Sequence, residues 1–533
     1  MQSTLRWCLV LLVTGLSLSA AFAADDELVR EFKKYFKKYK DAPSRIEAVL
    51  ALKGEQSTAV VGLMVPILDD DEPEVARAAI EVLAELKSPP AIKALMTELE
   101  DTKKEPIRLG ILETVAVGGL ALEPEVFYGT VEDKSWEVRR RGVNAIVAAA
   151  QSNPAVRVDL TDPDERAPRR PKDWPTSPVD AIDDLCLDKE PAVRCAALEG
   201  LAALDSDAVL APARELLSDE VWQVRASAIH SLTVVRDKDS IAPLIARMQL
   251  EEGRLVADIG KALGELTARN FGQDREGWQK YWADWGEGFK MPSDEQMKQY
   301  REAQKKTRAL YTPEGAVSYH GIETPSRRIL FVIDVSGSME NEVIEKERFE
   351  DGGYPSMSRM DIVKTELART IEGLEPYVEF NVQSFATEVK TWKKDIVKAN
   401  ILNKSSAVDY VTRLEALGGS SNNDLARAGL TASANLAAGK TNTYEALMEA
   451  LNAAGGGLKD SEYEVEVDTI FFLSDGRPST GKYVDTEDIL REVFKANELR
   501  KVVIHTIAIG EFQKSFMKQL ADKSGGVFVD LGR

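Results

Sequence analysis

A short pattern recurs through the first half of the chain at a nearly constant spacing. An acidic residue is followed five positions later by an apolar anchor and then often by Arg, as in Asp188…Val193-Arg194. Successive anchors are 32, 31, 55, 31 and 31 residues apart, at Val75, Ile107, Val138, Val193, Val224 and Leu255. A fixed period of this length predicts stacked repeats, in which each unit buries its apolar face against its neighbours.

Within each repeat, apolar residues recur at helical spacing, as in Val193, Ala197 and Leu201, and a second apolar helix follows. The Asp…Val-Arg pattern resembles the HEAT repeat family, which implies an all-α solenoid over residues 44–286. In that family, Asp and Arg side chains form ladders between repeats. Ala76 stands where an Arg would follow Val75, so the resemblance implies an incomplete ladder. The matching positions are Asp70, Asp133, Asp188 and Asp219, with Arg108, Arg139, Arg194 and Arg225.

Several segments interrupt or flank the repeats. The 55-residue step contains residues 159–178, which are rich in Pro and charge and are expected to form a loop. Residues 24–43 are basic and aromatic and are expected to form an amphipathic helix on the first repeat. Residues 287–325 are expected to form a linker. One helical face carries the aromatic residues Trp278, Tyr281, Trp282 and Trp285. This pattern favours a helix that covers the end of the solenoid, and the alternative is an aromatic platform for a ligand.

The N-terminus has the organisation of a signal peptide over residues 1–23. Arg6 precedes the apolar run Cys8–Ala20, and Ala21-Phe22-Ala23 is a small-residue cleavage site. We therefore expect export to the periplasm or the extracellular space, with no transmembrane segment after cleavage. The formal net charge of −20 disfavours nucleic acid as a partner and favours cations. After cleavage only Cys186 and Cys195 remain, and the sequence leaves a disulfide and two separate thiols both open.

Strand and helix patterns alternate through residues 326–533, which predicts a doubly wound (Rossmann-like) α/β domain with a parallel sheet. The expected strands are Ile329–Asp334, Val378–Ser384, Thr469–Ser474 and Val502–Ile509. The expected helices are Met360–Leu374, Val408–Leu417, Tyr444–Ala454, Thr486–Leu499 and Phe516–Lys523.

Oxygen-bearing side chains lie at three junctions of this domain. Asp334 ends a buried strand and is followed by Ser336 and Ser338, Asp475 follows another strand, and Thr441 precedes a helix. Ligands bind at the carboxyl edge of open α/β sheets. Carboxylate and hydroxyl oxygens suit Mg²⁺ better than zinc. The pattern therefore predicts one hard-cation site at this edge.

The Asp-x-Ser-x-Ser motif at 334–338, the Gly-x-Thr-Asn loop at 439–442 and Leu-Ser-Asp-Gly at 473–476 resemble the von Willebrand factor A (VWA) domain. The resemblance covers residues 326–533 and implies a metal-ion-dependent adhesion site (MIDAS). It implies hydroxyl ligands from Ser336, Ser338 and Thr441, with Asp334 and Asp475 acting directly or through water. Mg²⁺ is the expected ion, with Mn²⁺ and Ca²⁺ as alternatives. Ser420, in the similar stretch Gly418–Asn422, is a second candidate for the position of Thr441.

These features favour a non-enzymatic adhesion protein that holds an Asp or Glu carboxylate of a protein partner through the metal, with the solenoid as scaffold. A metal-assisted hydrolase is an alternative, but the chain has only three His residues, none of them in a ligand motif, and no catalytic residue is predicted. A scaffold subunit of an envelope or secretion assembly is another alternative. The acidic segment 340–351 interrupts the domain, either as a gate over the ion or as a solvated insertion.

Overall fold

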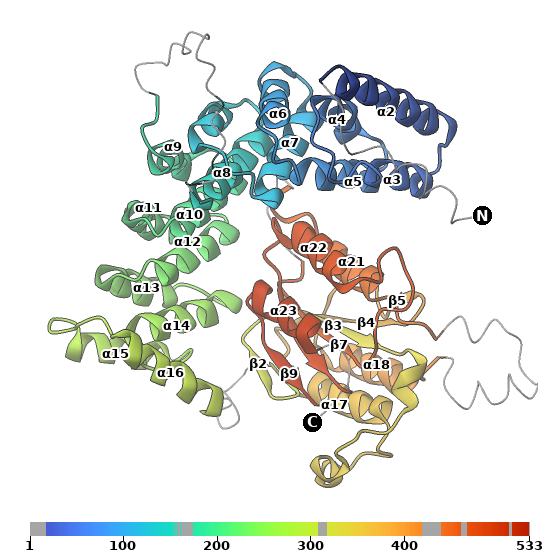
Figure 1. Ribbon diagram of the computed structural model, residues 1–533. Coiled ribbons are helices and arrows are strands. Elements are labelled where there is room, and N and C mark those ends of the chain that lie inside the picture. The colour runs from blue at the N-terminus through green and yellow to red at the C-terminus, as the bar shows by residue number, and fades with distance from the viewer. Residues whose placement is uncertain are drawn as a thin grey trace, which may run out of the picture. The chain divides into compact units, whose positions relative to one another are not determined.

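The computed structural model describes residues 18–153, 174–307, 317–417, 439–459, 466–510 and 514–531, together with residues 155, 157 and 160. Residues 1–17 of the expected signal peptide, most of the expected loop 159–178, and Ser420 lie outside this range. The chain divides into two compact units, residues 1–212 and 213–533. Helices alone fill the blue to light green part of Figure 1, and a sheet with helices fills the yellow to red part.

The repeats are helical, as the sequence predicts. The α-helices of the first unit are α2 (Leu18–Lys38), α3 (Ala42–Leu50), α4 (Thr58–Met64), α5 (Pro73–Ala84), α6 (Pro89–Asp101), α7 (Glu105–Gly118), α8 (Trp136–Gln151), α9 (Pro178–Asp183) and α10 (Pro191–Ala203), with α11 (Leu210–Leu216) at the boundary. The second unit continues with α12 (Trp222–Val234), α13 (Ile241–Met248), α14 (Arg254–Thr267), α15 (Arg275–Trp285) and α16 (Asp294–Thr307). All six anchors lie in the first turn of a helix and are at most 7% exposed. The repeat period therefore marked residues of the solenoid core.

Ion pairs connect neighbouring repeats. Arg108 pairs with Asp133, and Arg139 pairs with Asp188 at 2.7 Å, so an Arg of one repeat reaches the acid that opens the next. Asp70 pairs with Arg45 of α3. Asp70 therefore has an Arg partner from the preceding helix, which was not expected, whereas Ala76 has no guanidinium to offer the repeat that follows.

The thiols of Cys186 and Cys195 are buried and are not joined in a disulfide. Burial raises the pKa of the Cys186 thiol to about 12, so this side chain behaves as a small apolar core residue.

Helix α15, at the expected end of the solenoid, buries only part of its aromatic face. Trp278 of α15 is fully buried, donates its indole N–H to the Gly272 carbonyl at 2.9 Å and packs edge-on against Phe271. Trp285, by contrast, is 67% exposed. The expected linker contains α16, whose Met297 is buried.

None of the helices in the described ranges is long and apolar enough to cross a membrane.

In the described residues, a seven-stranded sheet forms the core of the C-terminal domain, in the order β5-β4-β3-β7-β8-β9, with β6 also paired to β4. Pairings among β3, β4, β7, β8 and β9 are parallel, and β5 and β6 run antiparallel to β4. The sheet is thus mixed, whereas the sequence predicted a parallel sheet. Its strands are β3 (Arg328–Asp334), β4 (Glu379–Phe385), β5 (Val389–Thr391), β6 (Val397–Lys398), β7 (Thr469–Ser474), β8 (Val503–Ala508) and β9 (Phe528–Asp530).

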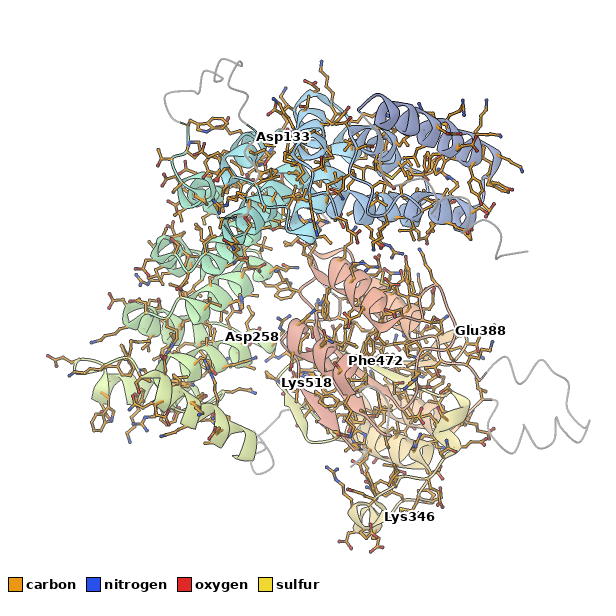
Figure 2. The ribbon with its side chains drawn as sticks, viewed as in Figure 1. Asp133, Asp258, Lys346, Glu388, Phe472 and Lys518 are labelled. Atoms are coloured by element: carbon orange, nitrogen blue, oxygen red, sulfur yellow. The ribbon has the colours of Figure 1, made fainter. Side chains whose placement is uncertain are left out.

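Helices cover both faces of this sheet, which makes it doubly wound. They are α17 (Arg359–Gly373), α18 (Ile401–Thr412), α21 (Thr443–Ala453), α22 (Thr486–Asn497) and α23 (Lys514–Ser524). Neighbouring residues of β7 point to opposite faces. Phe471 packs in the cluster that includes α17 and α18, and Phe472, labelled in Figure 2, packs with α21, α22 and α23.

A hairpin not foreseen from the sequence, β1 (Val317–Tyr319) and β2 (Ile322–Thr324), precedes the sheet. Its two turn residues, His320 and Gly321, have φ of 49° and 76°, as a tight hairpin turn requires. The imidazole packs against Tyr319, and its Nε2 is buried with no hydrogen-bond partner among the described residues.

Acid should destabilise the protein through His320. Burial lowers the pKa of its imidazole to about 4, although Glu366 opposes the shift. Because this pKa lies below that of the unfolded chain, the stabilisation is complete above about pH 6.5 and is lost as the pH falls towards 4. Urea unfolding at pH 7 and pH 5 should show that the wild type loses about 2 kcal/mol more than His320→Asn. Asn tolerates a positive φ, so the turn is kept. Equal pH dependence of the two proteins would contradict this role.

Candidate metal centre

Two carboxylates meet at the carboxyl edge of the sheet. Strands β3 and β7 are neighbouring parallel strands with Ile333 opposite Leu473, so Asp334 and Asp475 follow at adjacent strand ends. Asp334 is fully buried and Asp475 is 5% exposed. Both positions agree with the sequence prediction.

Hydrogen bonds hold both oxygens of Asp334. Its Oδ1 accepts from the backbone N–H of Ser336 at 2.8 Å, and its Oδ2 accepts from the hydroxyl of Ser474 at 2.6 Å. Ser474 is the last residue of β7, so this bond joins the two strand ends. The sequence motif contained Ser474, but its role was not foreseen.

The hydroxyls lie in one connected group. Ser336 Oγ is 3.2 Å from Ser338 Oγ, and Ser338 Oγ donates to Asp475 Oδ1 at 2.7 Å. The loop of Thr441 is held against this group because the N–H of Gly337 donates to the Gly439 carbonyl at 3.1 Å.

Further hydrogen bonds fix Thr441. Its N–H donates to Ser479 Oγ at 2.9 Å, and Asn442 caps α21 by accepting from the N–H of Glu445. Ser479 lies beyond the recognised motif, and the sequence offered no pattern that would single it out.

Gly476 shows how closely the ligand oxygens converge. A Cβ at this position would lie 3.1 Å from Thr441 Oγ1, 3.3 Å from Ser338 Oγ and 3.8 Å from Asp334 Oδ2. Three of the five predicted ligands, two from the end of β3 and the loop after it and one from the loop before α21, therefore surround one small space that a side chain would enter. This grouping fits a small cation bound by hard oxygen atoms.

The centre depends on hydroxyls. Within the described residues, no three His, Cys, Asp or Glu side chains gather into a group that could hold a metal ion. His505 lies on β8, where its Nδ1 accepts from the N–H of Val527, and His320 lies in the β1–β2 turn. Neither imidazole belongs to the group around Asp334.

The two carboxylates are buried close to each other, which disfavours their charged forms. Burial raises the pKa of Asp334, and the nearby charge of Asp475 raises it further. Burial also raises the pKa of Asp475, but the ion pair with Arg359 opposes this shift. Arg359 Nη1 lies 2.6 Å from Asp475 Oδ2, and the two side chains are 13% and 0% exposed. A divalent ion would relieve the repulsion between the two acids.

The acidic insertion is folded and anchored by apolar residues. Val343 and Phe349 belong to the core cluster beside α17, and the N–H of Val343 donates to the Met357 carbonyl at 2.9 Å. Lys346, labelled in Figure 2, pairs with Glu342. The insertion returns the chain to Arg359, whose N–H donates to the Asn341 carbonyl at 2.9 Å.

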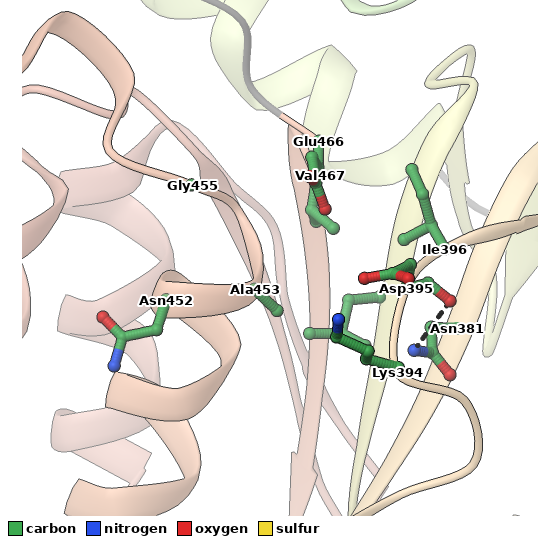
Figure 3. A pocket seen from close by; sticks show the side chains of 10 residues that line it. Asn381, Lys394, Asp395, Ile396, Asn452, Ala453, Gly455, Glu466 and Val467 are labelled. Carbon is green, nitrogen blue, oxygen red and sulfur yellow. Dashed lines mark hydrogen bonds between the residues drawn. The ribbon is translucent and has the colours of Figure 1, made fainter. Parts of the chain in front are cut away.

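A cavity lies towards the other edge of the same sheet. The cavity in Figure 3 has a volume of about 220 Å³ and is lined by Leu330 near the start of β3 and by Val467 just before β7. Asn381 uses its side-chain amide to hold the Lys393 and Asp395 carbonyls. The cavity is therefore separate from the metal centre.

Comparison with protein families gives two matches. The HEAT repeats model matches residues 31–116 and 180–264, and the von Willebrand factor type A domain model matches residues 351–530. The chain is a VWA domain protein with N-terminal HEAT repeats. The matched VWA residues begin beyond the Asp334–Ser338 loop and include Arg359, Thr441 and Asp475.

Curated relatives of the VWA domain protein include inter-alpha-trypsin inhibitor heavy chains. The human H4 chain is 27% identical over 209 residues, which cover 39% of this chain and 18% of the relative. The mouse heavy chain 4 is 30% identical over 120 residues, which cover 22% and 11%. The matches thus span less than a fifth of these relatives. A von Willebrand factor type A structure from Catenulispora acidiphila is 17% identical, covers 39% of each chain and has a TM-score of 0.27.

Proposed function

We propose that the VWA domain binds a divalent cation, Mg²⁺ first, and uses it to hold an Asp or Glu carboxylate of a protein partner. Ser336, Ser338 and Thr441 would supply hydroxyl oxygens, and Asp334 and Asp475 would bind directly or through water. The observation that carries this proposal is the convergence of Thr441 Oγ1, Ser338 Oγ and Asp334 Oδ2 beside Gly476.

The charges of the centre favour an anionic partner. Asp334 and Asp475 contribute −2, Arg359 contributes +1 and a divalent ion contributes +2, so the local sum is −2 + 1 + 2 = +1. The neutral hydroxyls leave this charge uncompensated, and Mg²⁺ keeps exchangeable water as further ligands. A carboxylate that replaces one such water would complete the charge balance.

We propose that the protein acts outside the cytoplasm, since residues 1–23 have the organisation of a signal peptide. The HEAT solenoid would serve as the scaffold, because stacked repeats present extended surfaces to partners. We propose a non-enzymatic role: His505 lies on β8 and accepts from the N–H of Val527, and His320 lies in the β1–β2 turn, so neither of these imidazoles serves the centre as a general base. A metal-assisted hydrolase and a scaffold subunit of an envelope assembly remain the alternative functions.

The proposal is tested by capture of partners from an envelope extract on the immobilised full chain, with Mg²⁺ or with EDTA. We expect a partner set that is retained in Mg²⁺ and released by EDTA. Carbodiimide and glycinamide treatment of the extract converts accessible carboxylates to amides, and it should abolish the capture. An unchanged partner set in EDTA, or after amidation, would contradict the carboxylate clasp. Metal-dependent cleavage of a captured protein would favour the hydrolase.

A further inference from the structure

The ion pair between Arg359 and Asp475 divides the two oxygens of this carboxylate between different partners. Asp475 Oδ2 accepts from Arg359 Nη1 at 2.6 Å, whereas Oδ1 accepts from Ser338 Oγ at 2.7 Å. Only Oδ1 therefore faces the hydroxyl group of the candidate metal centre. The resemblance to VWA domains implied ligands but assigned nothing to Arg359.

Asp334 is restricted in the same way. Its Oδ1 is held by the backbone of Ser336 and its Oδ2 by the hydroxyl of Ser474. Hence both oxygens of each acid already accept hydrogen bonds. Chelation of an ion by both oxygens of Asp475 would require Arg359 to move.

Arg359 has little room to move. It is the first residue of α17, directly after the N-cap Ser358, and its backbone is tied to Asn341. A Cβ at Gly510 would lie only 3.2 Å from both Cζ and Nη1, so the guanidinium packs flush against this glycine. Its Nε is buried and has no acceptor in the described part of the chain. Asp475 is thus the side chain that accepts the hydrogen bond of this guanidinium.

We propose that Arg359 restricts Asp475 to one ligand oxygen and thereby makes the centre select Mg²⁺ over Ca²⁺. Ca²⁺ takes about six to eight oxygens and often both oxygens of a carboxylate, whereas Mg²⁺ requires about six in a tight octahedron and retains water. A carboxylate fixed with one oxygen inward meets the requirement of Mg²⁺ and withholds a ligand from Ca²⁺. This inference rests on the proposed cation site and concerns the choice of ion.

Calorimetric titration of the full chain with MgCl₂ and with CaCl₂ tests the proposal. The wild type should bind Mg²⁺ more tightly than Ca²⁺. Arg359→Gln removes a positive charge, which strengthens binding of both ions, because both carry the same charge. The ratio of the two dissociation constants isolates coordination, and it should shift towards Ca²⁺ by about tenfold, equivalent to about 1.4 kcal/mol.

Arg369→Gln is the matched control. Arg369 also lies on α17 and pairs with an acid, Glu366, but its side chain is 50% exposed and it is not part of the metal centre. Its substitution should leave the ratio unchanged. An unchanged ratio in folded Arg359→Gln overturns the inference while leaving the cation site intact, and absence of binding by the wild type contradicts the proposed function itself. Should Arg359→Gln fail to fold by circular dichroism, equal affinity of the wild type for Mg²⁺ and Ca²⁺ still overturns the inference.

Discussion

Asp334→Asn should abolish the rise in melting temperature that Mg²⁺ gives the wild type. A ligand at a hundred times its dissociation constant stabilises the folded state by about 2.7 kcal/mol. For a domain of this size, that corresponds to a rise of roughly 5–10 °C in the melting transition of the VWA domain. The variant keeps the shape of the side chain but loses the buried charge between β3 and β7. Only one of the two carboxylates, Asp475, would then balance the charge of the ion.

Without metal, Asp334→Asn should be at least as stable as the wild type. Burial and Asp475 both disfavour the charged form of Asp334, and an amide removes that cost. The measurement is differential scanning calorimetry of the full chain in MgCl₂ and in EDTA. Asp409→Asn, at a side chain that is 67% exposed on α18, is the control and should keep the full metal shift. The same shift in Asp334→Asn and the wild type would refute the assignment of the centre.

Arg139→Ala should destabilise the solenoid by about 3–5 kcal/mol, the usual cost of breaking a buried ion pair from one side. The side chains of Arg139 and Asp188 are 9% and 8% exposed, and the two guanidinium bonds to Asp188 measure 2.7 and 2.9 Å. Arg139 also donates to the Asp133 carbonyl at 2.7 Å. The substitution therefore removes the guanidinium from a buried carboxylate and from a backbone carbonyl, and it leaves the charge of Asp188 without this cation.

Urea unfolding followed by circular dichroism measures this loss. Lys104→Ala is the control, because Lys104 is 66% exposed in its pair with Asp69 and such pairs contribute about 0–1 kcal/mol. The double variant Arg139→Met with Asp188→Asn should lose less stability than Arg139→Ala, since no buried charge remains and Asn can still accept from the N–H of Glu190. A loss below about 1 kcal/mol in Arg139→Ala would show that the buried pair is not a stabilising link between repeats.

The parts of the structure that the sequence predicted are those with a strong local pattern. The run Ile329–Ile333 is fully buried on both faces, which is why it carries no alternation and yet predicted β3 with its acid at the end. The repeat anchors were found because each occupies the same turn of successive helices. Asp475 and Thr441 followed from the rule that strand ends and helix starts share one edge of the sheet.

The missed features depend on contacts distant in sequence or on short elements. Arg359 pairs with a residue 116 positions away, and its approach depends on the fold of the preceding insertion. Strands β5 and β6 are three and two residues long, too short for a periodic pattern. Helix α18 begins at Ile401, earlier than the predicted Val408, because Asn400 caps it, although Ile401 is 82% exposed and breaks the apolar pattern.

The bond between Ser474 and Asp334 spans 140 positions of the chain. Strand β3 leaves the ribosome long before β7, and pairings of such sequence separation form slowly, since the intervening chain must be ordered first. A nascent chain that ends before β7 contains Asp334, Ser336 and Ser338 but neither the donor that orients Asp334 nor the second acid. Cation binding would therefore mark the completion of folding, and a chain arrested or misassembled before that pairing could not yet engage a partner through the metal.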